Sequence, residues 1–224
     1  MVARARVAHT FDWLRALCGH ARDGLHATTL LNPALWQHGN TVVLDASPWG
    51  GGGFLSVKGE PVTWFSTAWT AEDCRRLDIV IGDHRHQAVV EAYAILIGVR
   101  FWLQRWSIAP TVVLVKSDSI AALGSMERGG TTKNASLNLL LKELALVIAT
   151  VPTGLRLSFR HLPGARNEWA DALSRVAQPG SGACIPPPLL ACKRTGVEAR
   201  GDAFWITGQV PEEAVQVSNS QPEV

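Results

Sequence analysis

The chain has 224 residues, of which 47% are hydrophobic and 18% are charged, and its formal net charge at pH 7 is +2. This composition supplies enough apolar residues for a sizeable core and excludes a globally disordered chain, while the small net charge does not by itself indicate nucleic-acid binding. No uninterrupted apolar stretch approaches the roughly 18 residues of a membrane-spanning helix, and no apolar segment follows the N-terminal arginines, so we expect neither a membrane span nor a secretory signal.

The first half of the chain predicts a short helix, three antiparallel strands and a long helix. Apolar residues at helical spacing predict an amphipathic helix over residues 10–18. Runs of β-branched and apolar residues then predict three strands, at residues 41–46, 54–57 and 62–66. A glycine-rich turn is expected at residues 50–53, and a Lys-Gly-Glu hairpin turn joins the second and third strands. A polar connection over residues 70–85 leads to a helix over residues 87–106.

The second half predicts two further strands and three helices. The continuous apolar run at residues 111–115 indicates a strand buried on both faces, and the alternating run at residues 155–159 indicates a second strand. Helices are predicted at residues 119–127, 136–150 and 167–176. Asn167 is expected to be the N-cap of the last helix. The order βββ-α-β-α-α-β-α predicts an α/β fold with a mixed five-stranded sheet, three antiparallel strands and then parallel strands, flanked by helices.

Composition divides the chain into three parts. Residues 39–176 contain all the predicted strands and are expected to form one domain, preceded by an N-terminal extension at residues 1–38. Residues 177–224 are rich in Pro and Gly and end in polar residues, which predicts a flexible tail in which only residues 204–206 are apolar enough to dock locally. The four cysteines form no CxxC pair, which predicts reduced thiols in a cytoplasmic or nuclear protein.

Four acidic residues fall on four different predicted elements, and each has a simple local explanation. Asp45 interrupts an apolar strand, or it ends that strand and begins an Asx turn. Glu91 lies on or beside the buried stripe of a helix, or at its edge with the carboxylate in solvent. Asp118 follows a buried strand, where an N-cap is common, and Asp171 lies in the first turns of the last helix, where the helix dipole favours an acid.

Together the four acids support a single hypothesis. Carboxylates gathered at one edge of a small sheet would repel one another unless a cation lies between them. Oxygen ligands of this kind suit Mg²⁺ or Mn²⁺. Two such ions about 3.5–4 Å apart can hold a phosphodiester, activate a water molecule and stabilise the leaving oxygen. The sequence therefore indicates a metal-dependent phosphodiester hydrolase as one interpretation of this pattern.

The four acids lie in short motifs that can be compared with known families. The motifs are Val43-Leu44-Asp45-Ala46-Ser47, Glu91-Ala92-Tyr93-Ala94-Ile95, Lys116-Ser117-Asp118-Ser119 and residues 161–175, HLPGARNEWADALSR. Together they resemble the ribonuclease H domain of Gypsy-like and DIRS-like retroelement reverse transcriptases, and the last motif is the most specific. Gly129-Gly130-Thr131, followed by Ala135-Ser136-Leu137-Asn138, is similar to the DIRS-like branch. The resemblance covers about residues 40–176 and implies the ribonuclease H-like fold.

The resemblance also implies an activity, cofactors and partners. Asp45, Glu91, Asp118 and Asp171 match the metal-binding tetrad of the family, which holds two Mg²⁺ ions for which Mn²⁺ can substitute. His161 matches the loop histidine that these enzymes use near the attacking water or in product release. The implied reaction is endonucleolytic hydrolysis of the RNA strand of an RNA–DNA hybrid. The implied partner is a reverse transcriptase domain, whose connection region would end within residues 1–38.

The sequence also contains candidate nucleic-acid contacts and allows a comparison with alternative functions. The candidate nucleic-acid contacts are Ser47, Trp49, Ser119 and Asn167. A 3′–5′ exonuclease of similar fold is disfavoured because Ser47 stands where those enzymes carry a second acid. Transposases and integrases are disfavoured because they usually have Glu at the position of Asp171. The alternative from another class is a catalytically inactive retroelement relic that acts as a nucleic-acid-binding or scaffold module.

Overall fold

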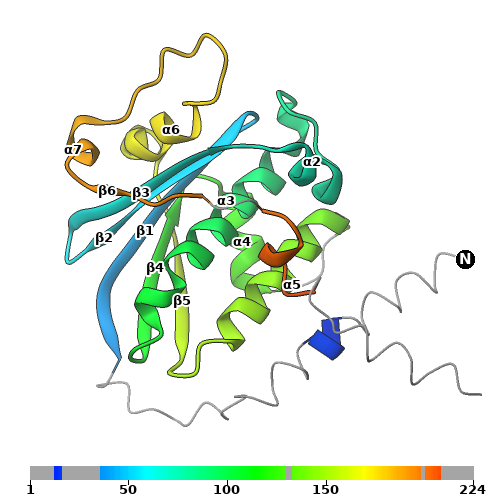
Figure 1. The fold of residues 1–224 in the computed structure, drawn as a ribbon, viewed down its shortest axis with the longest axis vertical. Helices are drawn as coiled ribbons and strands as arrows, with labels where there is room; N and C mark the ends of the chain where they lie inside the picture. Colours follow the sequence, from blue (N-terminus) through cyan, green and yellow to red (C-terminus); the bar gives the residue numbers. More distant parts are fainter. Residues whose placement is uncertain (1–12, 17–35, 130–132, 198–199, 208–224) are drawn as a thin grey trace, which may run out of the picture.

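The computed structural model describes residues 13–16, 36–129, 133–197 and 200–207 (Figure 1). Six strands of these residues form one sheet in the order β5-β4-β1-β2-β3-β6. Their bounds are β1 Gln37–Ser47, β2 Gly50–Val57, β3 Glu60–Ala68, β4 Thr111–Ser117, β5 Leu155–His161 and β6 Lys193–Arg194. β2 runs antiparallel to both β1 and β3, whereas β4 runs parallel to β1 and β5 runs parallel to β4.

Helices cover both faces of the sheet. Their bounds are α2 Ala71–Leu77, α3 Gln87–Trp102, α4 Ile120–Arg128, α5 Ala135–Ala149, α6 Glu168–Ser174 and α7 Pro187–Leu190, with short 3-10 turns η2 His84–His86, η3 Leu103–Trp106, η4 Gly164–Arg166 and η5 Asp202–Phe204. Figure 1 shows α6 and α7 on one side of the sheet and α3, α4 and α5 on the other. The strand directions and helix placement confirm the predicted α/β fold, a mixed sheet of antiparallel and then parallel strands flanked by helices. The sheet has six strands rather than five because β6 adds to the edge of β3.

The glycine run differs from its prediction. Residues 50–53 are not a turn but the start of β2, and the chain reverses at Pro48 and Trp49. The glycines are needed because helices lie directly against the strand. A Cβ atom at Gly52 would lie 2.5 Å from the Cβ of Leu173 and 2.6 Å from its carbonyl carbon, which is closer than atoms can approach. Glycine at this position therefore lets α6 pack tightly on β2.

The main core lies between the sheet and α3. Nearly every residue of α3 is buried, which explains why its apolar residues extend round the whole helix rather than along one stripe. Trp102 and Trp106 are buried in this core. The predicted helix over residues 87–106 ends at Trp102 and continues as η3. No helix of the described ranges has the length and apolar character that crossing a membrane requires.

The polar connection predicted over residues 70–85 contains a helix that the sequence interpretation missed. Thr70 and Asp73 form a capping box, in which each side chain accepts a hydrogen bond from the backbone N–H of the other residue. This T-x-x-D spacing is a recognised start signal for helices. Asp73 is itself buried, and its carboxylate also accepts hydrogen bonds from the Tyr93 hydroxyl at 2.6 Å and from the Arg200 guanidinium.

The C-terminal segment is part of the packed domain over much of its described length, which differs from the predicted flexible tail. β6 pairs with β3, with Thr63 opposite Lys193, and Phe204, Trp205 and Ile206 are buried in the main core. Polar contacts join the segment to α2 and α5 because Arg200 binds Asp73 and the buried Glu143 accepts hydrogen bonds from the backbone N–H groups of residues 206 and 207. The packed domain therefore extends well beyond residue 176.

The structure describes only part of the N-terminal segment in which a helix is predicted. Residues 13–16 are helical, Trp13 Nε1 donates to the Lys142 carbonyl at 3.3 Å, and Ala16 is buried in the core. The rest of the helix predicted over residues 10–18 lies outside the described residues. Cys74, Cys184 and Cys192 are free thiols, and Cys18 also lies outside the described ranges.

Candidate active site

Three carboxylates meet at the edge of the sheet where β1 and β4 end. Asp45 lies near the end of β1, Glu91 lies in the second turn of α3, and Asp118 directly follows β4. One carboxylate oxygen from each residue lies within 4.8 Å of the oxygens of the other two. The carboxyl ends of parallel strands are where sites form in open α/β sheets, so the topology itself brings these acids together.

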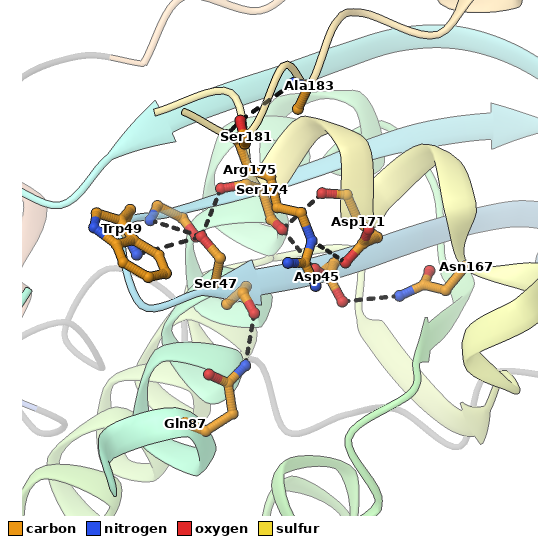
Figure 2. Close-up of polar contacts among 12 residues, drawn as sticks. Asp45, Ser47, Trp49, Gln87, Asn167, Asp171, Ser174, Arg175, Ser181 and Ala183 are labelled. Atoms are coloured by element: carbon orange, nitrogen blue, oxygen red, sulfur yellow. Dashed lines mark hydrogen bonds and ion pairs between the residues drawn. The ribbon is translucent and has the colours of Figure 1, made fainter. Parts of the chain in front are cut away.

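α6 holds the carboxylate of Asp45 in place (Figure 2). Asp45 is 4% exposed, and its Oδ1 accepts a hydrogen bond from Asn167 Nδ2 at 3.0 Å, while its Oδ2 accepts one from Ser174 Oγ at 2.6 Å. Asn167 does stand at the N-cap position of α6, as predicted, but its side chain makes no capping hydrogen bond. The side chain binds Asp45 instead, so this residue orients a carboxylate rather than capping the start of α6.

Glu91 is oriented by its own helix and by β4. Its Oε1 accepts a hydrogen bond from Gln87 Nε2 at 2.7 Å, and the same Nε2 donates to the Ala46 carbonyl at 2.6 Å. Ser117 Oγ lies 3.5 Å from the Oε2 of Glu91, on the other side of the carboxylate. Glu91 is 4% exposed, so the alternative of a glutamate that reaches solvent at the stripe edge is wrong.

Asp118 is free of the capping role that its position suggested. The N-cap of α4 is Ser119, whose side chain accepts a hydrogen bond from the Ala122 backbone N–H at 3.3 Å. The half-buried Asp118 carboxylate faces the loop between β5 and α6, where a Cβ atom on Gly164 would lie 3.5 Å from its Oδ2. That loop is held to β4 by a hydrogen bond of 2.9 Å from the Leu162 N–H to the Ser117 carbonyl.

Burial and mutual repulsion perturb the two buried acids. The pKa of Asp45 is raised from 3.8 to about 7, chiefly because burial removes solvent from the carboxylate. The charges of Asp118 and Asp171 also raise this pKa, whereas the hydrogen bond from Ser174 and the charge of Arg175 lower it. Burial also raises the pKa of Glu91 well above its usual range, with the Asp45 charge as a second cause. A cation among these oxygens would favour the ionised forms of both acids.

The donor set fits a hard divalent cation. Three carboxylate groups offer oxygen ligands at mutually close positions, and oxygen ligands are what Mg²⁺ and Mn²⁺ prefer. The Oδ1 atom of Asn167 adds a buried amide oxygen that has no hydrogen-bond partner among the described residues. Asp45, Glu91 and Asp118 could therefore hold such an ion, and the acceptor of Asn167 lies on the residue that binds Asp45.

Asp171 is beside the group of three carboxylates but not in it. Its Oδ1 forms an ion pair with Arg175 Nε at 2.6 Å, and its side chain is 41% exposed. Figure 2 shows both residues next to Asp45, and the charge of Asp171 is among the causes that raise the pKa of Asp45. Ser174 connects the two acids because its Oγ contacts Asp45 Oδ2 and, at 2.9 Å, the Asp171 carbonyl.

The remaining predicted residues have varied surroundings. His161 is exposed at the end of β5, opposite Ser117 of β4. Ser47 is buried, donates to the Ser174 carbonyl at 2.8 Å and accepts hydrogen bonds from the N–H groups of residues 49 and 50, so it stabilises the β1–β2 turn. The half-buried Trp49 ring packs edge-on against His84 at a centroid distance of 6.0 Å. Ser119 caps α4, and its hydroxyl is thereby used inside the protein.

Sequence reasoning missed the residues that position the acids. Gln87 precedes Glu91 by four residues, which places both on one helix face, so the spacing could have indicated their contact. Ser174 and Arg175 lie three and four residues after Asp171, which is again a helical spacing. The contact between Ser174 and Asp45 could not have been found in this way because it joins residues 129 positions apart.

Comparisons with known proteins give likenesses only among solved structures. No family model and no curated protein matches the chain. RNase H1 from the archaeon Halobacterium salinarum is 17% identical, with 60% of this chain and 92% of that chain covered, at a TM-score of 0.45. LC11-RNase H1, isolated from compost by a metagenomic approach, is 19% identical, with 63% and 96% covered, at 0.49. The same protein in complex with an RNA/DNA hybrid is 18% identical, with 60% and 92% covered, at 0.47.

Proposed function

We propose that the protein is a metal-dependent ribonuclease H that hydrolyses the RNA strand of RNA–DNA hybrids and derives from a retroelement reverse transcriptase. The single observation that carries this proposal is the group formed by Asp45, Glu91 and Asp118, whose oxygens lie within 4.8 Å of one another at the sheet edge. The motif at residues 161–175 supports the retroelement origin, because it is the part of the chain that most resembles retroelement ribonuclease H. The same motif supplies both Asn167 and Asp171 beside the group.

Asp45, Glu91 and Asp118 would hold divalent cations, and Asp171 would contribute a fourth carboxylate to them. The fit rests on the oxygen donor set and on the raised pKa values of the two buried acids, which a cation would return toward the usual range. We propose two Mg²⁺ ions, with Mn²⁺ as a substitute. When bound, such ions supply positive charge that holds a phosphodiester and lowers the pKa of an attacking water molecule.

The chain's own residues orient the acids and move protons. Asn167 and Ser174 hold the Asp45 carboxylate from the side of α6, and Gln87 holds that of Glu91 from within α3. Hydrogen bonds of this kind fix a metal-binding carboxylate before substrate arrives and reduce the reorganisation needed for reaction. His161 lies exposed at the end of β5, where its imidazole can exchange a proton with solvent.

The second candidate function is a nucleic-acid-binding or scaffold module without hydrolytic activity. The observation that favours it is the ion pair between Asp171 and Arg175, which neutralises the fourth carboxylate. Against it stands the exposure of that pair, because a surface ion pair is worth only about 0–1 kcal/mol and is easily broken. A reverse transcriptase domain as partner and a cytoplasmic or nuclear location belong to the proposal in either case.

Neutral substitution of the acids tests the assignment. We expect Asp45→Asn and Asp118→Asn each to lower the single-turnover rate on a labelled hybrid in Mg²⁺ by orders of magnitude, because each removes charge from the metal site without changing volume. The matched control is Asp78→Asn, at an exposed left-handed position after α2 that asparagine tolerates. Equal rates for the wild type and both site variants would contradict the proposed function.

A further inference from the structure

The sheet face that carries α6 also carries a row of cations. Side chains alternate along a strand, so the burial of Leu155, Leu157 and Phe159 against the core places Arg156 and Arg160 of β5 on the opposite face. The register pairs Arg160 with Lys116, Lys116 with Val43, and Val43 with Phe54. Side chains paired across adjacent strands point to the same face, so these residues lie on the face on which α6 packs. α6 lies on β1, β2 and β3, whereas the arginines of β5 are exposed.

Lys116 and Arg160 are directly opposite each other on adjacent strands. Like charges at such positions repel and destabilise a sheet. The ion pairs among the described residues include neither Lys116 nor Arg160, so neither cation is directly neutralised by a carboxylate there. Arg166, at the end of η4, likewise forms none of these ion pairs. A binding partner that carries repeated negative charge would convert this unfavourable arrangement into a favourable one.

A hollow of about 390 Å³ lies on this sheet face, with Lys116 and Arg166 among its lining residues. Its floor is the sheet face, including Phe54 and Lys116, and its other wall includes Arg166, Glu168 and Trp169, so two cations and one acid line it. The rings of Phe54 and Trp169 lie 5.5 Å apart inside it. The hollow lies beside the site because Lys116 is two residues from Asp118 and because Arg166 directly precedes the asparagine that holds Asp45.

We propose that this sheet face binds the phosphodiester backbone of a nucleic-acid strand that extends beyond the candidate active site. Cationic side chains with hydroxyls and aromatic rings among them are suited to phosphates and sugars, whereas an acidic peptide would not use the rings. Arg156 and Arg160 are four residues apart, or ~13 Å along a strand. This length matches about four nucleotides at a rise of about 3.4 Å each. The extent of the strand rests on the proposed function, but binding of phosphates by these cations does not.

The test compares two double variants of equal charge. Arg160→Gln with Arg166→Gln alters the proposed surface, and Arg75→Gln with Arg105→Gln alters exposed arginines of α2 and η3. Binding of the full chain to a labelled RNA–DNA hybrid and to a DNA duplex is measured in chelator over a range of salt concentrations. We expect the first pair to raise Kd for both ligands by roughly 10–100-fold near 0.1 M salt. We also expect it to reduce the slope of log K against log salt by about 2.

The control pair should leave that slope unchanged. Equal effects of the two pairs on Kd, or no effect of either pair, would overturn the proposal that this surface binds nucleic acid. The second of these results is also the one expected if the surface binds an acidic protein instead. The result separates from the proposed function because binding to the DNA duplex does not depend on hydrolysis. A wild type that cleaves no hybrid but shows the expected difference in slope contradicts the nuclease and supports the surface. Cleavage of the hybrid by the wild type, with no difference in slope between the two pairs of variants, supports the nuclease and contradicts the surface.

Discussion

Replacing Asp45 by asparagine should stabilise the protein at neutral and alkaline pH. In the absence of divalent cation the buried carboxylate is ionised at high pH, where it is desolvated and repelled by Asp118 and Asp171. Asn has the same size and is neutral, and its amide oxygen can still accept the hydrogen bond from Ser174. Its new N–H can be paired if the Asn167 amide turns so that its Oδ1 accepts. The substitution therefore removes an unfavourable charge while it leaves the packing of α6 on β1 in place.

The magnitude follows from the pKa of Asp45. The folded state raises this pKa from 3.8 to about 7, and one pKa unit corresponds to about 1.4 kcal/mol, so the ionised form costs the folded state up to about 4 kcal/mol. Below 3.8 the group is protonated in both folded and unfolded chains and the cost vanishes. Between 3.8 and about 7 only the folded state retains the proton, so wild-type stability falls as pH rises through this window and levels off above it.

The assay is urea unfolding of wild type and variant in chelator at several values of pH between 4 and 8.5. We expect Asp45→Asn to match the wild type at the acidic end and to exceed it by about 2–4 kcal/mol at the alkaline end. Added Mg²⁺ should stabilise the wild type and should have less effect on the variant, because a ligand stabilises the state that binds it. Asp78→Asn is the control and should show neither trend. A variant that is less stable at every pH, or a gain that does not change with pH, would refute the reasoning.

Three further predictions concern other parts of the molecule. His161→Ala should slow single-turnover cleavage by roughly 10–10³-fold, as expected for lost proton transfer, and should leave the metal dependence unchanged; superimposable pH–rate profiles would remove the histidine from the mechanism. Gly52→Ala should cost about 1–3 kcal/mol in urea unfolding because the new methyl group meets Leu173, and an unchanged midpoint would show that α6 can move away. Trp205→Ala should cost about 3–5 kcal/mol because the ring is 1% exposed, whereas a flexible tail would show no loss.

The order of strands and helices could be predicted because each depends on local sequence. The apolar run of β4, the hairpin at Lys58 and the pattern of α3 are set by residues close to one another in the chain. The grouping of Asp45, Glu91 and Asp118 followed from the topology, since strand ends meet at one edge of the sheet.

What the sequence did not indicate depends on contacts between distant segments. β2 looks like a turn from its four glycines, and only the packing of α6 upon it explains why they are in a strand. Sequence analysis allowed residues 204–206 to dock but could not identify their distant partners, which are the stacked Tyr93 ring and the buried Glu143. The contact of Ser174 with Asp45 likewise joins residues 129 positions apart, which no local pattern indicates.

The measurement that tests the central claim most directly is strand-specific cleavage by the full chain. An RNA–DNA hybrid with a different label on each strand, an RNA duplex and a DNA duplex are incubated with wild type and Glu91→Gln, with Mg²⁺ and with chelator. We expect the wild type to cut only the RNA strand of the hybrid, only when Mg²⁺ is present, and we expect Glu91→Gln to be slower by orders of magnitude. Cleavage of the DNA strand or of either duplex at a similar rate, or an intact hybrid after incubation with folded wild type and Mg²⁺, would contradict the assignment.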